Sequence, residues 1–177
     1  MSCCAGTGFD PRRAARRNRN RMRWRRNFLT GRAVGAPFGA LTLDSSPGEV
    51  AAAIIHEARR RGHSLYQTTA ILADALQESN LSPRAHSPNM LWPSIFQQDA
   101  SYPGRRNPNL AIDEFFNRLD RHGGPSSPDI WKSIFWLQQR PGKPSAAAAW
   151  AHRRQPYLAE VKGRYQSAVT MYREIVA

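Results

Sequence analysis

The sequence is poor in cysteine and lacks long apolar runs. Its two cysteines, Cys3 and Cys4, are adjacent and far from any predicted core. They cannot hold the domain together as a disulfide, and no second cysteine pair completes a zinc site. No apolar stretch reaches the roughly 18 residues that would span a bilayer. We therefore expect no metal site, no cofactor and no transmembrane segment.

Acidic residues are also few, since 13 Asp and Glu stand against 26 Lys and Arg, a net charge of +13. Most of this imbalance belongs to residues 1–32, where ten arginines and one acid, Asp10, give a net charge of +9. The other 145 residues carry the remaining +4. The charge alone would suggest a nucleic-acid-binding protein, but that function does not explain why the basic residues are confined to one end.

Residues 1–32 are predicted to form a basic arm, disordered or loosely helical, because like charges repel and oppose compaction. Such an arm can contact nucleic acid, anionic wall polymers or anionic lipid through counterion release. The segment Arg25-Arg26-Asn27-Phe28-Leu29 also matches a twin-arginine export pattern. Against export, Arg32 and Pro37 interrupt the apolar stretch that follows. Residues 33–45 are predicted to be a linker by their glycine, proline and serine content.

Residues 46–177 are predicted to form an all-α domain. Capping boxes at Ser46/Glu49 and Ser64/Gln67 indicate two helix starts, and apolar residues then recur at three- and four-residue intervals to the end of the chain. His56 and His63 have no partners at metal-ligand spacing and are expected at the surface. The predicted helices cover residues 47–61, 64–79, 109–122, 128–140 and 145–152, with one more from about residue 157 onward.

Glu78 lies in the last turn of the predicted helix 64–79, on the edge of its apolar face. Burial against apolar side chains raises the pKa of a carboxyl group and suits it to donate a proton. From spacing alone, a solvated glutamate is the favoured interpretation. Asp74, one turn earlier, is expected to point too far along the helix to share a site with Glu78.

A series of short motifs surrounds Glu78. Glu78-Ser79 is followed by Ser82-Pro83-x-Ala85-x-Ser87-Pro88 and then by Ser94-Ile95-Phe96-Gln97. This order resembles the signature of the lysozyme-like lytic transglycosylases, in which a Glu-Ser pair at a helix end precedes a Pro-x-Ala loop and a Gly-x-x-Gln turn. Ser94 stands where the wider family has glycine. The closest resemblance, over roughly residues 50–160, is to the muralytic domain of mycobacteriophage tape-measure proteins; FQQDASYPGR and PDIWKSIFWLQQRPG are specific to that group.

The resemblance implies a lysozyme-like fold with a long substrate-cleft loop. It implies an enzyme that cuts the β-1,4 bond between MurNAc and GlcNAc in peptidoglycan, with Glu78 acting first as acid and then as base. The 6-hydroxyl of the substrate would attack and leave a 1,6-anhydro sugar. Ser79, Ser87 and Gln97 would then lie near the sugar.

The loop 81–108 supplies the other candidate binding residues. The amide groups of Gln97 and Gln98 suit sugar hydroxyls, and the aromatic faces of Trp92 and Tyr102 suit the apolar faces of sugar rings. Trp92 fits the role of a core anchor equally well. Asp99 is the candidate for the second carboxylate that a hydrolase needs to activate water or attack the sugar.

Three functions therefore remain open for the domain. A lytic transglycosylase with one catalytic glutamate is favoured over a two-carboxylate lysozyme, and a non-catalytic virion or wall-binding protein is the third. The expected partners are peptidoglycan strands and other virion tail proteins. The expected location is a phage tail or, after export, the bacterial cell wall.

Overall fold

The structure, a computed structural model, describes residues 41–151 and 155–177, all within the compact unit Gly35–Ala177. This part is mostly helical, as the sequence predicts, and its nearest approach to a strand is an isolated bridge between His86 and Pro93. The basic arm, the twin-arginine motif and residues 33–40 of the predicted linker lie outside the described residues.

The described helices follow the predicted order. None of them is long and apolar enough to cross a membrane. Their bounds are α2 Pro47–Arg60, α3 Leu65–Ser79, α4 Pro108–Arg121, the 3-10 helix η1 Gly124–Ser126, α5 Ile130–Gln139, α6 Ala146–Trp150, α7 Gln155–Gly163 and α8 Tyr165–Val176.

Both predicted capping boxes are present. Ser46 Oγ accepts from the Glu49 amide at 3.3 Å, while the Glu49 carboxylate accepts from the Ser46 amide at 2.8 Å. At the start of α3, Ser64 and Gln67 make the same pair of bonds, at 3.2 and 2.9 Å. Each box satisfies backbone donors that the first turn of a helix leaves free, and so fixes where the helix begins.

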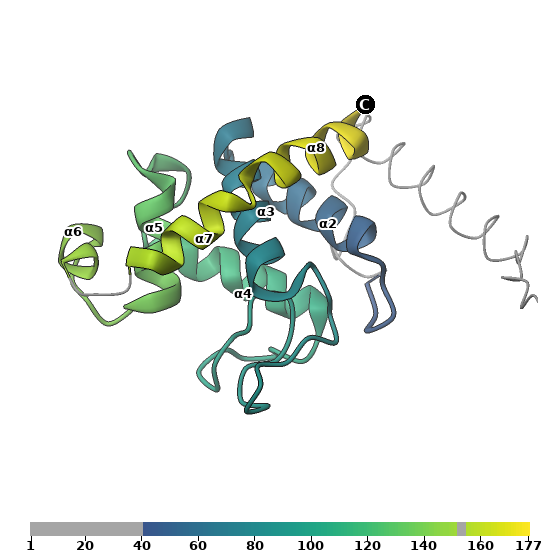
Figure 1. The fold of residues 1–177 in the computed structure, drawn as a ribbon, viewed down its shortest axis with the longest axis horizontal. Coiled ribbons are helices and arrows are strands. Elements are labelled where there is room, and N and C mark those ends of the chain that lie inside the picture. Colours follow the sequence, from purple (N-terminus) through teal and green to yellow (C-terminus); the bar gives the residue numbers. More distant parts are fainter. Residues whose placement is uncertain (1–40, 152–154) are drawn as a thin grey trace, which may run out of the picture. The chain divides into compact units, whose positions relative to one another are not determined.

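Helix α3 is the centre of the domain. It packs against α2, α5, α7 and α8, and in Figure 1 α7 and α8 cross it. Every residue from Gln67 to Ala75 is buried, so α3 is enclosed on all sides over this stretch rather than along one face. A polar side chain in this segment therefore has to find its partners inside the protein.

The last predicted helix is divided into two. The prediction of one continuous helix is wrong, because α7 ends at Gly163 and α8 starts after Arg164, whose ψ of −7° departs from helical geometry. The apolar spacing continues across the break, and it therefore gave no sign of it in the sequence.

The end of the predicted linker contacts the domain. Leu41 is buried, and its carbonyl accepts from Asn109 Nδ2 at 3.1 Å. Asp44 forms an ion pair with Arg84 at 2.6 Å. Residues 41–45 therefore pack against the loop that follows α3 and the start of α4.

His63 is buried, so the expectation of a surface position is wrong for this residue. Its ring lies 5.6 Å from that of Phe116, and neither ring nitrogen has a partner among the described residues. Gly62, with φ of +85°, turns the chain at the end of α2 and directs the next residue inward. Burial lowers the pKa of His63.

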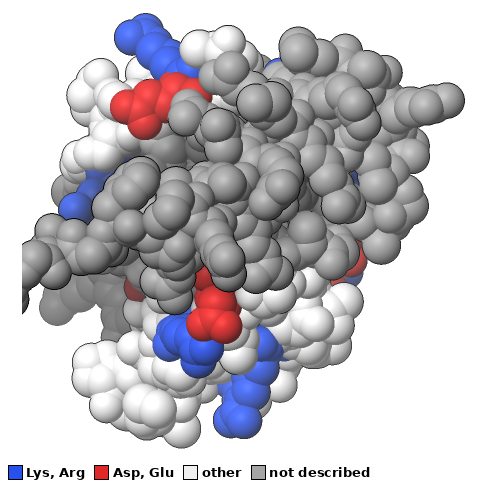
Figure 2. Space-filling model, turned by 90° about the vertical axis from the view of Figure 1, so that its right-hand side faces the viewer, with Lys and Arg blue, Asp and Glu red and all other residues white. Residues whose placement is uncertain are grey.

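Charges of the described residues are largely balanced by neighbours. Glu57 is fully buried and accepts from Arg60 and Arg61, and Arg61 also reaches Asp113 and Asp120 at 2.9 and 2.6 Å. In Figure 2, blue and red side chains of the described residues adjoin one another, and the rest of the described surface in view is uncharged. This mixture agrees with the small net charge of the sequence beyond residue 32.

Candidate active site

Glu78 lies at the end of α3, as predicted, and is half-buried there. Asn80 caps the helix with φ of 52° and Leu81 follows with φ of 63°, so the chain turns sharply just past Glu78. Burial raises the pKa of Glu78, and nearby Glu160 adds to the rise, whereas a hydrogen bond from Tyr157 opposes it. A raised pKa keeps the proton on a carboxyl group to higher pH and so suits it to act as a proton donor.

A buried network reaches Glu78 from the core. The Tyr157 hydroxyl lies 2.7 Å from Glu78 Oε1 and 2.8 Å from Asp74 Oδ1. Gln138 Nε2 donates to the other oxygen of Asp74 at 2.9 Å. Three helices, α3, α5 and α7, thus contribute side chains to one hydrogen-bonded chain that ends at Glu78.

Burial changes the acidity of this network. Asp74 is fully buried, which raises its pKa to about 8, and nearby Glu78 adds to the rise. Burial and the two neighbouring carboxyl groups also raise the pKa of Tyr157 well above its usual value. At neutral pH, both Asp74 and Tyr157 therefore hold their protons.

Two bonds attach the long loop to the end of α3. Ser79 Oγ donates to the Ile95 carbonyl at 2.7 Å, and Gln97 Nε2 donates to the backbone carbonyl of Glu78. Phe96, between them, is fully buried and stacks on Phe115 of α4 with ring centroids 3.7 Å apart. The 94–97 turn is therefore fixed directly beside Glu78.

Ser94 has a left-handed backbone conformation, which is the kind that glycine adopts easily. Its φ is +79°, and Gln97 in the same turn has φ of +44°. Left-handed φ values are unfavourable for residues with a Cβ and ordinary for glycine. The turn therefore keeps its shape in spite of the serine.

Two of the predicted binding residues, Ser87 and Trp92, differ in exposure. Ser87 is buried, and its hydroxyl donates to Asn89 at 2.6 Å and accepts from the Trp92 amide at 3.0 Å. Trp92 itself is 45% exposed, next to the exposed Met90 and Leu91. Ser87 thus shapes the turn, while Trp92 is free to contact a ligand, and the core-anchor interpretation of Trp92 is wrong.

Gln98 and Tyr102 are used inside the protein. Gln98 is buried and donates to the Ala111 carbonyl at 2.7 Å, which ties the loop to α4. Tyr102 is buried beneath Arg118, whose guanidinium carbon lies 3.7 Å from the ring centroid. Burial raises the pKa of Tyr102 to about 12. Both side chains support the loop, and their predicted contact with substrate stays a prediction.

Asp99 is exposed and follows the 94–97 turn. Its Oδ1 accepts from the amide and the hydroxyl of Ser101, at 2.7 and 2.6 Å. These bonds, with Arg118 and Arg105 nearby, hold the pKa of Asp99 below its usual value. Asp99 is therefore ionised at neutral pH and has no bond to the Glu78 network among the described residues.

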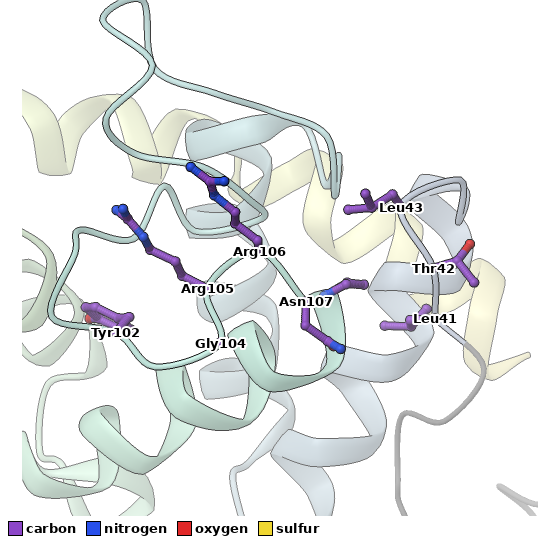
Figure 3. Close-up of a pocket in the computed structure, with 9 residues that line it drawn as sticks. Leu41, Thr42, Leu43, Tyr102, Gly104, Arg105, Arg106 and Asn107 are labelled. Carbon is purple, nitrogen blue, oxygen red and sulfur yellow. The ribbon is translucent and has the colours of Figure 1, made fainter.

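The 640 Å³ pocket drawn in Figure 3 lies away from Glu78. Across it, Leu41 and Leu43 face the turn that carries Arg105, Arg106 and Asn107. Glu78 is not among the residues that line it. The better candidate for an active site is Glu78, because its pKa is raised and the long loop is bonded to the end of α3 beside it.

Tyr157 and Gln138 could not be predicted as part of the network around Glu78, because both belong to helices far away along the chain. Asp74 could have been recognised, since it is the one acid in an otherwise apolar helical run from Ile71 to Leu76. That Asp74 points too far along the helix to serve as a second carboxylate stays a prediction, but Tyr157 connects the two carboxyl groups.

The described residues contain no group of three or more His, Cys, Asp or Glu side chains arranged to hold a metal ion. No protein-family model, curated protein or solved structure matches the chain.

Proposed function

We propose that this protein cleaves the glycan strands of peptidoglycan, with Glu78 as the general acid. The observation that supports the proposal most directly is the state of Glu78 itself. It ends a buried helix, its pKa is raised by burial, and one of its oxygens, Oε1, is held by the Tyr157 hydroxyl. Its other oxygen has no hydrogen bond among the described residues.

The reaction begins with transfer of a proton from Glu78 to the glycosidic oxygen. The bond between that oxygen and C1 breaks, and positive charge develops on the sugar. In the lytic route implied by the resemblance, the 6-hydroxyl oxygen bonds to C1 while the Glu78 carboxylate takes up its proton. The bond from Tyr157 favours the first step, because a donor stabilises the carboxylate that proton transfer leaves on Glu78.

Asp99 offers little support for a two-carboxylate hydrolase. It is bonded to Ser101 and exposed, whereas Glu78 is bonded to Tyr157. We therefore favour the lytic transglycosylase. Mass spectrometry of a digest should find 1,6-anhydro ends, and Asp99→Asn should retain substantial activity. Reducing ends together with an inactive Asp99→Asn protein would indicate a lysozyme instead.

The decisive test of the proposed function is Glu78→Gln, assayed on purified peptidoglycan. The amide has nearly the same shape but has no acidic proton to donate, and general acid catalysis contributes about 10²- to 10⁴-fold in rate. The matched control is Glu174→Gln, the same substitution at an exposed side chain of α8, which should clear peptidoglycan normally. Normal clearing by folded Glu78→Gln protein would exclude Glu78 from the reaction. No clearing by the wild-type protein would favour a structural, wall-binding role.

By resemblance to the tape-measure muralytic domains, we place the activity in a phage tail that crosses the host wall. The folded part needs only glycan strands as its partner for this role. The basic arm is proposed to contact nucleic acid or anionic wall polymers, in which case binding should weaken steeply with added salt.

A further inference from the structure

Asp74 is a buried acid without a cation. Its side chain is fully buried, and it forms no ion pair with the described residues. Its two oxygens meet two neutral groups, the Gln138 amide at 2.9 Å and the Tyr157 hydroxyl at 2.8 Å. A charged carboxylate in this place would be desolvated with no opposite charge to compensate it, so the neutral acid is the stable form.

The number of protons in the network fixes the direction of its hydrogen bonds. The Tyr157 hydroxyl lies between Asp74 Oδ1 and Glu78 Oε1, but a phenol has one proton to donate. One of the two carboxyl groups must therefore donate to the phenol oxygen. The fully buried Asp74 is the better candidate, because Glu78 reaches solvent and can ionise at lower cost.

We propose that Asp74 is a positioning residue that acts as a neutral acid, donating to Tyr157 so that Tyr157 donates to Oε1 of Glu78. The inference rests on the proposed function, in which Glu78 is the general acid. With Oε1 occupied by the Tyr157 proton, the acidic proton of Glu78 is placed on Oε2, the oxygen free to meet a substrate. After transfer, the same bond stabilises the Glu78 carboxylate.

An ionised Asp74 would reverse this arrangement. It would accept the Tyr157 proton, and the phenol oxygen would then accept from Glu78 Oε1, which directs the acidic proton into the protein. The groups that face the pair are Tyr157 and Glu160 of α7, Gln138 of α5 and Tyr102 of the loop. None of them is a cation that would favour ionised Asp74 at neutral pH.

The first test compares two substitutions of similar size at position 74. In Asp74→Asn, the amide nitrogen can donate to Tyr157 and its oxygen can accept from Gln138, as the neutral acid does. We expect kcat on soluble glycan strands to stay within about threefold of wild type. Asp74→Leu can neither donate nor accept, and we expect kcat to fall about tenfold with KM little changed.

Two outcomes would overturn the proposal. If folded Asp74→Asn is as inactive as Glu78→Gln, the reaction needs a carboxylate at position 74. If Asp74→Leu is as active as Asp74→Asn, the donated proton has no role.

The second test reads the protonation state of the wild-type protein directly. Carbon-13 NMR of the side-chain carboxyls, with Asp74 assigned from its missing signal in Asp74→Asn, should show Asp74 protonated at pH 6 and titrating only near pH 8. An ionised Asp74 at pH 6 would overturn the proposal. This measurement needs no substrate, so it stands even if the wild-type protein cleaves no peptidoglycan and the proposed function fails.

Tyr157→Phe tests the second bond of the chain. Its loss removes the donor that stabilises the Glu78 carboxylate, so the pKa of Glu78 should rise further in the same titration. The matched control is Tyr165→Phe, because the Tyr165 hydroxyl bonds to Thr69 at 3.2 Å and not to either carboxyl group. A Glu78 titration unchanged by Tyr157→Phe would show that the proton of Tyr157 goes to Asp74 instead, contrary to the proposal.

Discussion

The buried acid Asp74 should contribute a part of the stability that decreases as the pH rises, and Asp74→Asn should remove this part of the pH dependence. The pKa of Asp74 is raised from 3.8 to about 8 by folding. The folded state therefore binds this proton more tightly than the unfolded state does. Its contribution to stability is complete below pH 3.8 and is lost progressively as the pH rises through about 8. Asn has no such proton, so the Asp74→Asn protein should not lose this stability as the pH rises.

The size of the effect follows from the width of that window. One pKa unit corresponds to about 1.36 kcal/mol, so each pH unit between the two pKa values should favour Asp74→Asn over wild type by about that amount. Between pH 5 and pH 7, the difference in unfolding free energy between the two proteins should grow by about 3 kcal/mol. Contributions from Glu78 and His63 occur in both proteins and largely cancel in the difference.

Urea unfolding at several pH values from 5 to 8 measures this difference. The matched control is Asp44→Asn, the same substitution at a side chain that is 81% exposed and forms an ion pair with Arg84. Its effect should not grow with pH. A difference between wild type and Asp74→Asn that stays constant over the whole range would refute the reasoning, because it would mean that Asp74 is already ionised in the folded protein.

Three further predictions concern stability and can be measured by urea unfolding. Ser94→Gly should raise the unfolding free energy by about 0.5 kcal/mol, because relief of a left-handed serine, about 1–2 kcal/mol, exceeds the entropy cost of glycine; a loss of stability would contradict this. Arg61→Met should lower it by about 3 kcal/mol, because buried Glu57 loses its most enclosed partner. Burial lowers the pKa of His63, so its contribution to stability is lost as the pH falls below 6.5; the unfolding free energy of the wild type relative to His63→Leu should therefore decrease on acidification, and a constant difference would contradict this.

The parts of the fold set by neighbouring residues were predictable from the sequence. Ser64 and Gln67 fix the start of α3 through bonds that span three residues, and Asn80 ends it. Glu78 therefore had to lie at a helix end. Its half-buried state did not follow from the apolar spacing, which allowed a solvated glutamate as well.

The partners of Glu78 depend instead on how distant helices pack. Tyr157 is 79 residues from Glu78 along the chain, and its helical spacing indicated a buried face without indicating what lay opposite. The same limit explains His63, whose burial is due to α4 rather than to its own neighbours in the sequence. The bonds of Ser79 and Gln98 to the backbone carbonyls of Ile95 and Ala111 could not be read from residue type either.

The C-terminal helices α7 and α8 both pack against α3, and this packing assembles the site. Tyr157 of α7 meets Asp74 and Glu78 at one end of α3, while Tyr165 of α8 meets Thr69 further toward its start. A shift of α7 by one turn would carry the Tyr157 hydroxyl beyond hydrogen-bond reach of both carboxyl groups. The packing of α7 and α8 along α3 thus decides whether Glu78 receives its donor, although every motif that resembles a catalytic signature lies in the preceding part of the chain.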